Sequence, residues 1–496
     1  MKIFPALTTP LLLTGLLLTS GALVNPMPAA AQENSSSIAL AIENRILRST
    51  AIRSKDVKAA FQDGVVTLSG SVDNLEASHH AVEAAQTVRG VESVVNQIQV
   101  EAPEVKNDIL LNNINEALKW NLAAENWNIT PTVENGKVTL NGMVDSYAEK
   151  RIVESSVSSL LGVVAVDNQL KVELKEKRSA AEIKSEVEAL LAATATLDSS
   201  ELKVSVDDTK VILSGKVSNL KERHRAVECA QIAGVTEVDA KGLEIDWESG
   251  DGMQRRDTER HLTDESISEA ISRALNYHPL TVNEGEQIAV NSTKGKVTLL
   301  GDVSRLAVKN TAEMIARDTI GVNEIDNRIR VVWTSTDDRP ADVEISEDIS
   351  AAVARDAYLQ SADIIPQTKS AHAHLYGMVD SEFEKQRAGK IAANQKGVVH
   401  VANYLTVSKR WEPKSDEAIL EAINTELELI NTSPTVEVKV TVQNGVPILS
   451  GKVDTWFQWQ SLNEIAVNAG GRNIHNDVKI NLVAFGGQSS LYVPDN

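Results

Sequence analysis

The stretch of sequence that decides the fold is Val66-Thr67-Leu68-Ser69-Gly70-Ser71-Val72. Apolar and polar residues alternate in it, and residues two apart on a strand point to the same face of a sheet. The stretch therefore predicts a strand whose buried face carries Val66, Leu68, Gly70 and Val72. Its pattern returns five times along the chain, at 138–144 (VTLNGMV), 211–217 (VILSGKV), 297–303 (VTLLGDV), 373–379 (AHLYGMV) and 447–453 (PILSGKV).

Glycine and asparagine recur in phase with this strand. Every copy has a central glycine, and a second glycine follows it 19 or 20 residues later. Six residues further on stands an asparagine in five copies and Ala240 in the third. The strand pattern, the second glycine and the asparagine recur with nearly the same spacing, which indicates six copies of one structural unit. The central glycines, which we interpret as structural, are Gly70, Gly142, Gly215, Gly301, Gly377 and Gly451.

Each unit is predicted to contain a helix, two strands, a second helix and a third strand, in that order. In the first unit Ile38, Ile42 and Ile46 have the spacing of an amphipathic helix, and Asp63-Gly64 is a hairpin signal between two strands. A strand–helix–strand connection places the third strand parallel to the second. The predicted fold class is α+β, a tandem array of six small αββαβ sandwiches, each with two helices on a three-stranded mixed sheet.

The repeat registers also predict the domain boundaries. The six units are expected at 36–101, 105–174, 179–247, 262–334, 342–409 and 414–484, with a linker at 248–261 and a tail at 485–496. The linker is polar and rich in charge of both signs. We therefore expect three units on either side of a flexible midpoint.

The recurring glycine and asparagine both have structural explanations. Glycine within a strand usually marks a close approach of another backbone. The second helix carries small residues such as Ala81 and Ala85, so we expect this helix to cross over the glycine. The asparagine interrupts an apolar strand, where its amide can satisfy backbone groups at a bend. We favour this interpretation over a role as a ligand.

The pattern V-x-L-x-G-x-V, followed by a helix ending in Gly-Val and then V-x-N-x-hydrophobic, resembles the BON domain family, named for bacterial osmotically inducible and nodulation proteins. The resemblance covers nearly the whole chain after residue 31 and is weakest in the third unit, which lacks the asparagine. It implies periplasmic or envelope-associated binding modules, often with affinity for phospholipid surfaces, and no catalytic machinery.

Composition and charge exclude several classes of protein. The 496 residues are 42% hydrophobic and 24% charged, as in ordinary globular proteins. Lys and Arg number 49 against 69 Asp and Glu, a net charge of −20, which argues against nucleic acid as a partner. The single Cys229 excludes an intramolecular disulfide framework and a thiolate-rich metal site.

Residues 1–31 have the order of a secretory signal peptide. Lys2 precedes an apolar run from Leu11 to Val24, and Ala29-Ala30-Ala31 is a small-residue cleavage signal. Cleavage after Ala31 would place the protein in the periplasm or outside the cell, peripheral to a membrane rather than spanning it. An uncleaved N-terminal anchor is the alternative.

Trp456, Phe457 and Trp459 are the candidate contact for a lipid or a protein partner. They cluster where the sixth unit begins its second helix, at positions where the first unit is mostly polar. Exposed aromatic side chains at a helix start can insert at a membrane interface or anchor a protein. The alternative is that they pack against the fifth unit or the chain terminus.

The remaining candidates for chemistry are few. His372 and His374 lie on one face of a predicted strand and could share a metal, with His400 as a third ligand, but two solvated histidines are the favoured interpretation. Cys229 aligns with apolar residues and is expected to be a buried, inert thiol. No phosphate loop, zinc-protease motif or nucleophile elbow is present in a suitable context. We therefore expect no enzyme, no metal and no cofactor.

Two functions remain open. The first is an exported, non-enzymatic, multivalent binding protein of the cell envelope that associates with phospholipid surfaces and contributes to osmotic stress tolerance. Six weak modules on one chain would raise its avidity. The second is a periplasmic scaffold or chaperone-like protein that contacts envelope proteins, which the acidic balance favours because anionic lipid would repel it.

Overall fold

The computed structural model describes residues 29–492, except 53, 55, 120, 122–123, 125–127, 175–176, 247–262, 333–338, 409–413, 431–436, 454–455, 472–473 and 483–489. Residues 1–28 of the predicted signal peptide and all of the 248–261 linker lie outside this part of the chain. The predicted cleavage point after Ala31 lies in the first turn of the first helix. Within the described residues, no helix is both long enough and apolar enough to cross a bilayer.

The elements follow the predicted order six times. The first domain contains α1 (Ala29–Arg48), β1 (Lys58–Gln62), β2 (Val65–Ser69), β3 (Ser71–Val72), α2 (Leu75–Gln86), β4 (Ser93–Asn96) and β5 (Gln99–Val100). The second contains α3 (Asn107–Lys119), β6 (Thr130–Glu134), β7 (Lys137–Asn141), β8 (Met143–Val144), α4 (Tyr147–Ser158), β9 (Ala165–Asn168) and β10 (Lys171–Val172). The third contains α5 (Ala180–Ala193), β11 (Lys203–Asp207), β12 (Lys210–Val217), α6 (Leu220–Ala230) and β13 (Glu237–Ile245).

The last three domains repeat the same plan. The fourth contains α7 (Asp264–Tyr277), the 3-10 helix η1 (Gly285–Gln287), β14 (Ala289–Thr293), β15 (Lys296–Val303), α8 (Leu306–Arg317) and β16 (Glu324–Val331). The fifth contains α9 (Asp342–Arg355), β17 (Asp363–Lys369), β18 (His372–Val379), α10 (Glu382–Ala393), β19 (His400–Asn403) and β20 (Thr406–Val407). The sixth contains α11 (Asp416–Ile430), β21 (Glu437–Gln443), β22 (Val446–Val453), α12 (Trp456–Asn468), β23 (His475–Leu482) and β24 (Ser490–Tyr492).

The predicted α+β sandwich is confirmed. In the fourth domain β14 pairs antiparallel with β15, and β15 pairs parallel with β16. Val297, Leu299 and Val303 alternate along β15 and are buried against the two helices, while the residues between them face outward. Each small sheet therefore has one face covered by helices and one face open.

The central glycine is structural, but the element that approaches it differs from our expectation. A Cβ on Gly70 would lie 2.3 Å from the carbonyl oxygen of Asp56, and one on Gly215 would lie 2.1 Å from that of Glu201. Both carbonyls belong to the backbone leading into the first strand, 14 residues earlier in the chain, and not to the second helix. The glycine φ is positive at every such position, which L side chains rarely adopt. The expected contact with the second helix was wrong.

The recurring asparagine acts as predicted. In the fifth domain the Asn403 amide nitrogen donates to the Lys385 carbonyl on α10, and its amide oxygen accepts from the Leu405 N–H two residues on. The equivalent amides all bridge the second helix and a bend in the third strand; they belong to Asn96, Asn168, Asn327 and Asn476. One side chain thus satisfies backbone groups on two elements, so it is not available as a ligand.

A second recurring device joins the first helix to the hairpin. The hairpin turns adopt positive φ at both central residues, as at Asp63 and Gly64, which is the geometry of a type I′ turn. In three domains the turn N–H groups donate to a carboxylate at the start of the first helix, namely Asp264, Asp342 or Asp416. These hydrogen bonds fix the hairpin against the helix and keep the sheet in register.

The domains contact one another, and each domain of the first half of the chain contacts one of the second half. The first and sixth domains meet through Arg45 of α1 and Glu426 of α11, 2.6 Å apart. The second and fifth meet where the Leu161 N–H donates to the Arg355 carbonyl. In the third and fourth, Arg273 of α7 lies 3.5 Å from Glu186 of α5. The first domain therefore pairs with the sixth, the second with the fifth and the third with the fourth. This is the pairing expected when the two halves of the chain run antiparallel to each other.

The third and fourth domains make reciprocal contacts. The Ala233 N–H donates to the Tyr277 carbonyl, and the Ile320 N–H donates to the Ala193 carbonyl. In each pair the donor precedes the second glycine of its domain, and the acceptor ends the first helix of the other domain. These two bonds are related by a local twofold symmetry, so the junction is a true domain–domain interface rather than a chance contact.

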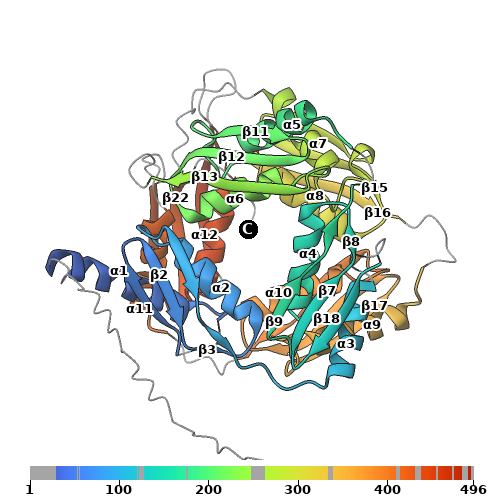
Figure 1. Ribbon diagram of the computed structural model, residues 1–496, viewed down its shortest axis with the longest axis horizontal. Coiled ribbons are helices and arrows are strands. Elements are labelled where there is room, and N and C mark those ends of the chain that lie inside the picture. The colour runs from blue at the N-terminus through green and yellow to red at the C-terminus, as the bar shows by residue number, and fades with distance from the viewer. Residues whose placement is uncertain are drawn as a thin grey trace, which may run out of the picture.

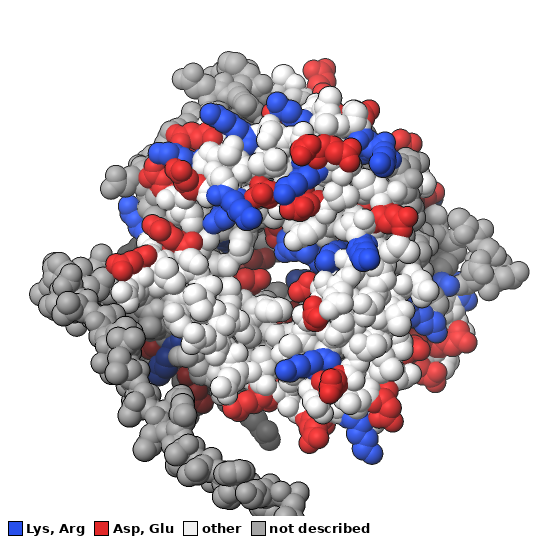
Figure 2. Space-filling view, viewed as in Figure 1, with Lys and Arg blue, Asp and Glu red and all other residues white. Residues whose placement is uncertain are grey.

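The six domains surround a central opening. Figure 1 shows the second helix of each domain, α2, α4, α6, α8, α10 and α12, placed around it. Figure 2 shows the same face hollowed at its centre, with Lys, Arg, Asp and Glu side chains along the rim and over β12 and β13. The two halves of the chain therefore pack against each other, and the flexible midpoint expected at 248–261 lies outside the described residues.

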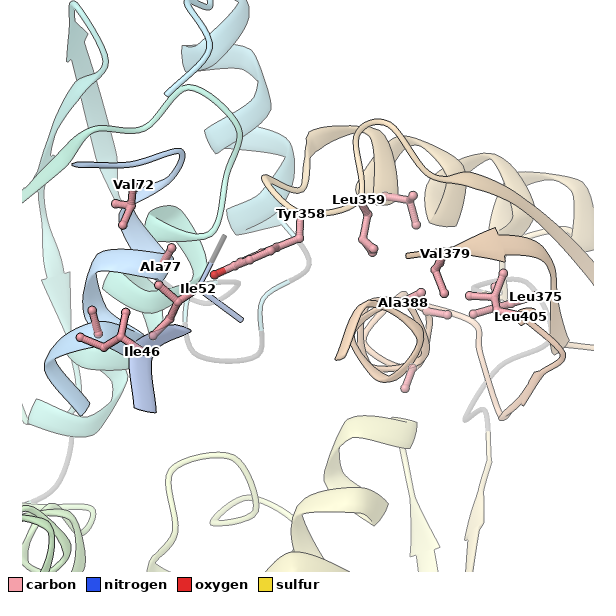
Figure 3. Packing of buried hydrophobic residues seen from close by; sticks show 14 of the residues in the cluster. Ile46, Ile52, Val72, Ala77, Tyr358, Leu359, Leu375, Val379, Ala388 and Leu405 are labelled. Atoms are coloured by element: carbon pink, nitrogen blue, oxygen red, sulfur yellow. The ribbon is translucent and has the colours of Figure 1, made fainter. Parts of the chain in front are cut away.

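The first and fifth domains share one hydrophobic core. Tyr358 of the fifth domain extends toward Ile52 of the first, as Figure 3 shows, and its hydroxyl donates to the Ala51 carbonyl at 2.6 Å. Beside it, the Arg387 guanidinium donates to the carboxylates of Asp356 and Glu76. The side chains of Arg387 and Asp356 are only 13% and 4% exposed. Apolar and ionic contacts together make the two domains one packing unit.

Acid should weaken the junction of the third and fourth domains through His278. Burial, and to a lesser extent the Arg225 guanidinium, lowers the pKa of His278 to about 4, and its Nδ1 accepts the Leu280 N–H. An unfolded histidine titrates near 6.5. The unfolded chain therefore binds the proton first, so stability is lost as pH falls from about 6.5 to about 4, by up to about 3 kcal/mol.

Urea unfolding at pH 7.5 and 4.5 tests this expectation. His278→Asn keeps an acceptor for the Leu280 N–H but does not titrate, so its unfolding midpoint should fall less between the two pH values than that of the parent protein. Equal losses in the two proteins would contradict it.

Candidate binding surface

The predicted aromatic contact does not form as one exposed cluster. Trp459 is 5% exposed, and its indole N–H donates to the Val478 carbonyl at 2.9 Å. Trp459 is therefore part of the core of the sixth domain, and the expectation that it is an exposed contact was wrong. The side chains of Trp456 and Phe457 lie outside the described residues, although both residues begin α12.

The open sheet faces of the domains differ in charge. On the third domain Lys210 pairs with Glu237 and Lys216 with Asp246, each at 2.8 Å. The fourth domain carries the same kind of cross-strand ion pair, such as Arg330 with Asp302 at 2.8 Å. Exposed pairs of this kind contribute little to stability, but they keep a surface hydrated and unsuited to apolar contact.

The open sheet face of the fifth domain is aromatic and aliphatic instead. We call it the His–Tyr face and define it by Ile365 of β17, His372, His374, Tyr376 and Met378 of β18, His400 of β19 and the following Tyr404. Four of these side chains are large, apolar and exposed, at 56% for Tyr404, 52% for Met378, 51% for Ile365 and 40% for Tyr376. Among the described residues no salt bridge joins side chains of this face.

Strand register stacks the rings of the His–Tyr face. Tyr376 and Tyr404 lie 5.4 Å apart with planes at 16°, and His374 lies 6.0 Å from Tyr404 at 5°. Since His374 also lies 6.4 Å from Tyr376 at 11°, the three nearly parallel rings form a triangular cluster from β18 and the residue that follows β19. Stacked rings lose little conformational freedom when a partner covers them, which suits a contact surface.

The histidines of this face are a pair and a third ring that stacks elsewhere. His372 lies opposite His400 in the parallel ladder, with ring centroids 5.6 Å apart. His374 projects from the same face but stacks on the tyrosines. Within the described residues no three His, Cys, Asp or Glu side chains are close enough together to hold a metal ion.

Cys229 is placed as a structural thiol. Its Sγ lies 3.2 Å from Thr194 Oγ1, and burial raises its pKa. A thiol held protonated is a poor nucleophile. The expected inert role agrees with this environment.

One open groove lies beside the His–Tyr face. It has a volume of about 460 Å³ and is lined by α9 and β17, including Asp342, Glu347, Ser346 and Thr368. The Asp342 carboxylate already accepts the N–H groups of Ser370 and Ala371, which lowers its pKa. This carboxylate is thus committed to the hairpin turn and is poorly suited to acid–base chemistry.

Comparisons with known proteins agree with the fold. The BON domain model matches residues 34–102, 107–173, 179–246, 263–332, 341–409 and 415–481. Osmotically-inducible protein Y of Escherichia coli (strain K12) is 31% identical over 144 residues, which cover 28% of this chain and 72% of that protein.

Two solved structures are also similar to part of the chain. CdsD, a structural protein of the type III secretion system of Chlamydia trachomatis, is 16% identical, with a TM-score of 0.12, over 42% of this chain and 93% of that one. The PrgH periplasmic domain is 9% identical, with a TM-score of 0.13, over 42% and 96%. The six family matches span most of the sequence and coincide with the six αββαβ units, so the chain belongs to the BON domain family.

Proposed function

We propose that this protein is an exported, non-enzymatic binding protein of the cell envelope that associates with phospholipid surfaces through the His–Tyr face of its fifth domain. The relative's designation as osmotically inducible supports a contribution to osmotic stress tolerance. The N-terminal segment, with its charged start, apolar run and Ala29-Ala30-Ala31, supports export.

The observation that carries the proposal is the composition of the His–Tyr face. Tyrosine has an apolar ring and a polar tip, which suits the boundary between lipid chains and water. Ile365 and Met378 flank the rings and are about half exposed. A flat sheet bearing such side chains can rest on a bilayer without inserting a helix.

Charge does not prevent this contact despite the net charge of −20. At physiological ionic strength charges farther than about 8 Å from a surface are largely screened. The only carboxylate in the β17–β18 ladder beside these rings is Asp363, opposite Met378 at its far end. The face itself is neutral when its histidines are neutral, so zwitterionic lipid is the expected ligand near neutral pH.

Vesicle flotation tests the proposal. We expect the full-length mature protein to float with phosphatidylcholine vesicles at pH 7.5 and to do so nearly as well in 0.5 M NaCl. The double variant Tyr376→Ser and Tyr404→Ser should lower binding by about tenfold or more, because two exposed rings no longer leave water.

Leu300→Ser is the matched control. Leu300 is 38% exposed and lies on the open sheet face of the fourth domain, so its loss should leave flotation unchanged. If no vesicle binds the parent protein, the lipid proposal is wrong and the protein-scaffold alternative is favoured.

A further inference from the structure

We propose that the His–Tyr face is an acid-gated site for anionic phospholipid headgroups, in which His372, His374 and His400 turn a neutral surface into a cationic one. This inference rests on the proposed function and adds to it a ligand chemistry and a means of regulation. Histidine is the side chain whose charge ordinarily changes between pH 5 and 8.

The sheet brings the three imidazoles together. His372 and His374 are two residues apart on β18, so both project from the open face, and the parallel register sets His400 of β19 opposite His372. The His372 and His400 ring centroids are 5.6 Å apart. A headgroup phosphate resting on this face would meet all three rings rather than one.

Few negatively charged side chains lie near the three histidines to balance the positive charge that protonation adds. In the β17 ladder Lys369 lies opposite His372 and Gln367 opposite His374, while Asp363 lies four residues from Gln367 at the other end of the strand. The His372 Nδ1 is 3.0 Å from the Ser370 carbonyl oxygen. From the fourth domain Lys309 adds a positive charge near His400. With two lysines and one distant carboxylate, protonation leaves the face positive.

Neighbouring positive charges also make His400 harder to protonate. Burial, then the proximity of His372, His374 and Lys309, lowers the pKa of His400. His400 is therefore expected to gain its proton late as the solution is acidified. The His374 ring stacks on the rings of Tyr376 and Tyr404.

The size of the expected effect follows from membrane electrostatics. Each positive charge held near an anionic surface strengthens binding by about fivefold at physiological salt. Two added charges would therefore give roughly 25-fold, and their mutual repulsion lowers the expected rise to about tenfold. Zwitterionic vesicles carry no net charge, so their binding should barely change.

Flotation with two vesicle types at two pH values tests the inference. Phosphatidylcholine vesicles and vesicles with one quarter phosphatidylglycerol are compared at pH 7.5 and 5.5. The parent protein should bind the anionic vesicles about tenfold better at pH 5.5, with little change on phosphatidylcholine. The triple variant H372Q/H374Q/H400Q should lose this rise, so that its binding to the anionic vesicles is about the same at the two pH values.

A matched variant and a folding measurement complete the test. His475→Gln removes an exposed histidine from β23 on the sixth domain, so it should keep the tenfold rise. Circular dichroism melting checks that all variants are folded. An equal rise in the triple variant, or no rise in the parent protein, overturns the inference alone. Absence of binding to every vesicle at both pH values overturns the proposed function as well.

Discussion

Replacing Arg387 by alanine is expected to lower the free energy of unfolding of the first and fifth domains by about 3–5 kcal/mol. The Arg387 guanidinium donates to both oxygens of Glu76, at 2.9 and 2.6 Å, and to both of Asp356, at 2.8 and 2.7 Å. It also lies 4.7 Å over the Tyr358 ring. The alanine variant leaves two carboxylates at a buried junction without their cation, and burial already raises the pKa of Asp356.

Calorimetry and hydrogen exchange measure this effect. A loss of that size should lower the melting temperature of the unit by on the order of 10 °C and speed amide exchange in α2 and α10 together. Because the two helices are about 300 residues apart in sequence, their joint exposure would identify the shared core as the unit that opens.

Two control variants distinguish the loss of the buried ion-pair network from the loss of an exposed charge. Arg328→Ala breaks a pair with Asp326 in which the arginine side chain is 65% exposed, and it should change stability by less than about 1 kcal/mol. The triple variant E76Q/D356N/R387M removes all three charges and should be less destabilised than R387A. If R387A melts like the parent protein, the junction does not hold the two domains together.

The unit could be predicted from the sequence because its determinants are local and repeated. The alternation around Gly70, the Asp63-Gly64 turn and the Asn96 bend each depend on residues within one strand or turn. Repetition then distinguishes a structural requirement from chance, since a glycine that recurs six times in the same register points to backbone geometry. The partner of that glycine was missed because the carbonyl that approaches it has no side-chain signature.

The arrangement of the domains could not be predicted in the same way. The bond between Arg387 and Glu76 spans 311 residues, and neither residue belongs to the repeating pattern. Tyr358, which carries the shared core, stands directly after a helix end where other domains have unrelated residues. A contact that is made only once in the chain leaves no repeated sequence pattern, so it cannot be predicted by comparing the domains with one another.

The candidate surface was partly visible in the sequence. The sequence predicts that His372 and His374 lie on one face of a strand, and the burial of Leu375 between them and Tyr376 agrees with that alternation. The same period of two continues through Tyr376 and Met378, so the sequence also places these two side chains on the face of His372 and His374. Tyr404 could not be added without the register of the third strand.

Trp459 was predicted to be exposed because the equivalent residues in the other domains are polar, and this prediction was wrong. It occupies the position of Ser78 in the first domain, which is itself only 1% exposed. At this position the recurring asparagine reaches the second helix, and Asn476 donates to the Trp459 carbonyl. A small polar residue can be buried at such a site, so polarity of a counterpart is weak evidence for exposure.

Replacing Gly377 by alanine is expected to destabilise the fifth domain by more than about 3 kcal/mol. The φ of Gly377 is +123°, and an added Cβ would lie 1.8 Å from the carbonyl oxygen of Asp363, far inside any allowed contact. To admit the methyl group, β17 must separate from β18, and the β17–β18 ladder that aligns the His–Tyr face would be lost. Hydrogen exchange should accelerate in β17 and, through the shared core, in α2, while α7 of the fourth domain, whose buried residues lie in a separate core, stays protected.

Gly389→Ala provides the matched control within the same domain. Gly389 lies inside α10, and the nearest atom to an added Cβ is the Asn403 amide nitrogen at 3.1 Å, a close contact with a side chain rather than with backbone. Its change should stay within about 1 kcal/mol, because alanine favours the helix while the contact with Asn403 opposes it. Gly377→Ala should also abolish vesicle binding even where the rest of the protein remains folded. A Gly377→Ala protein with protected β17 and unchanged flotation would show that the strand can move without loss, and that the glycine is not what fixes the sheet.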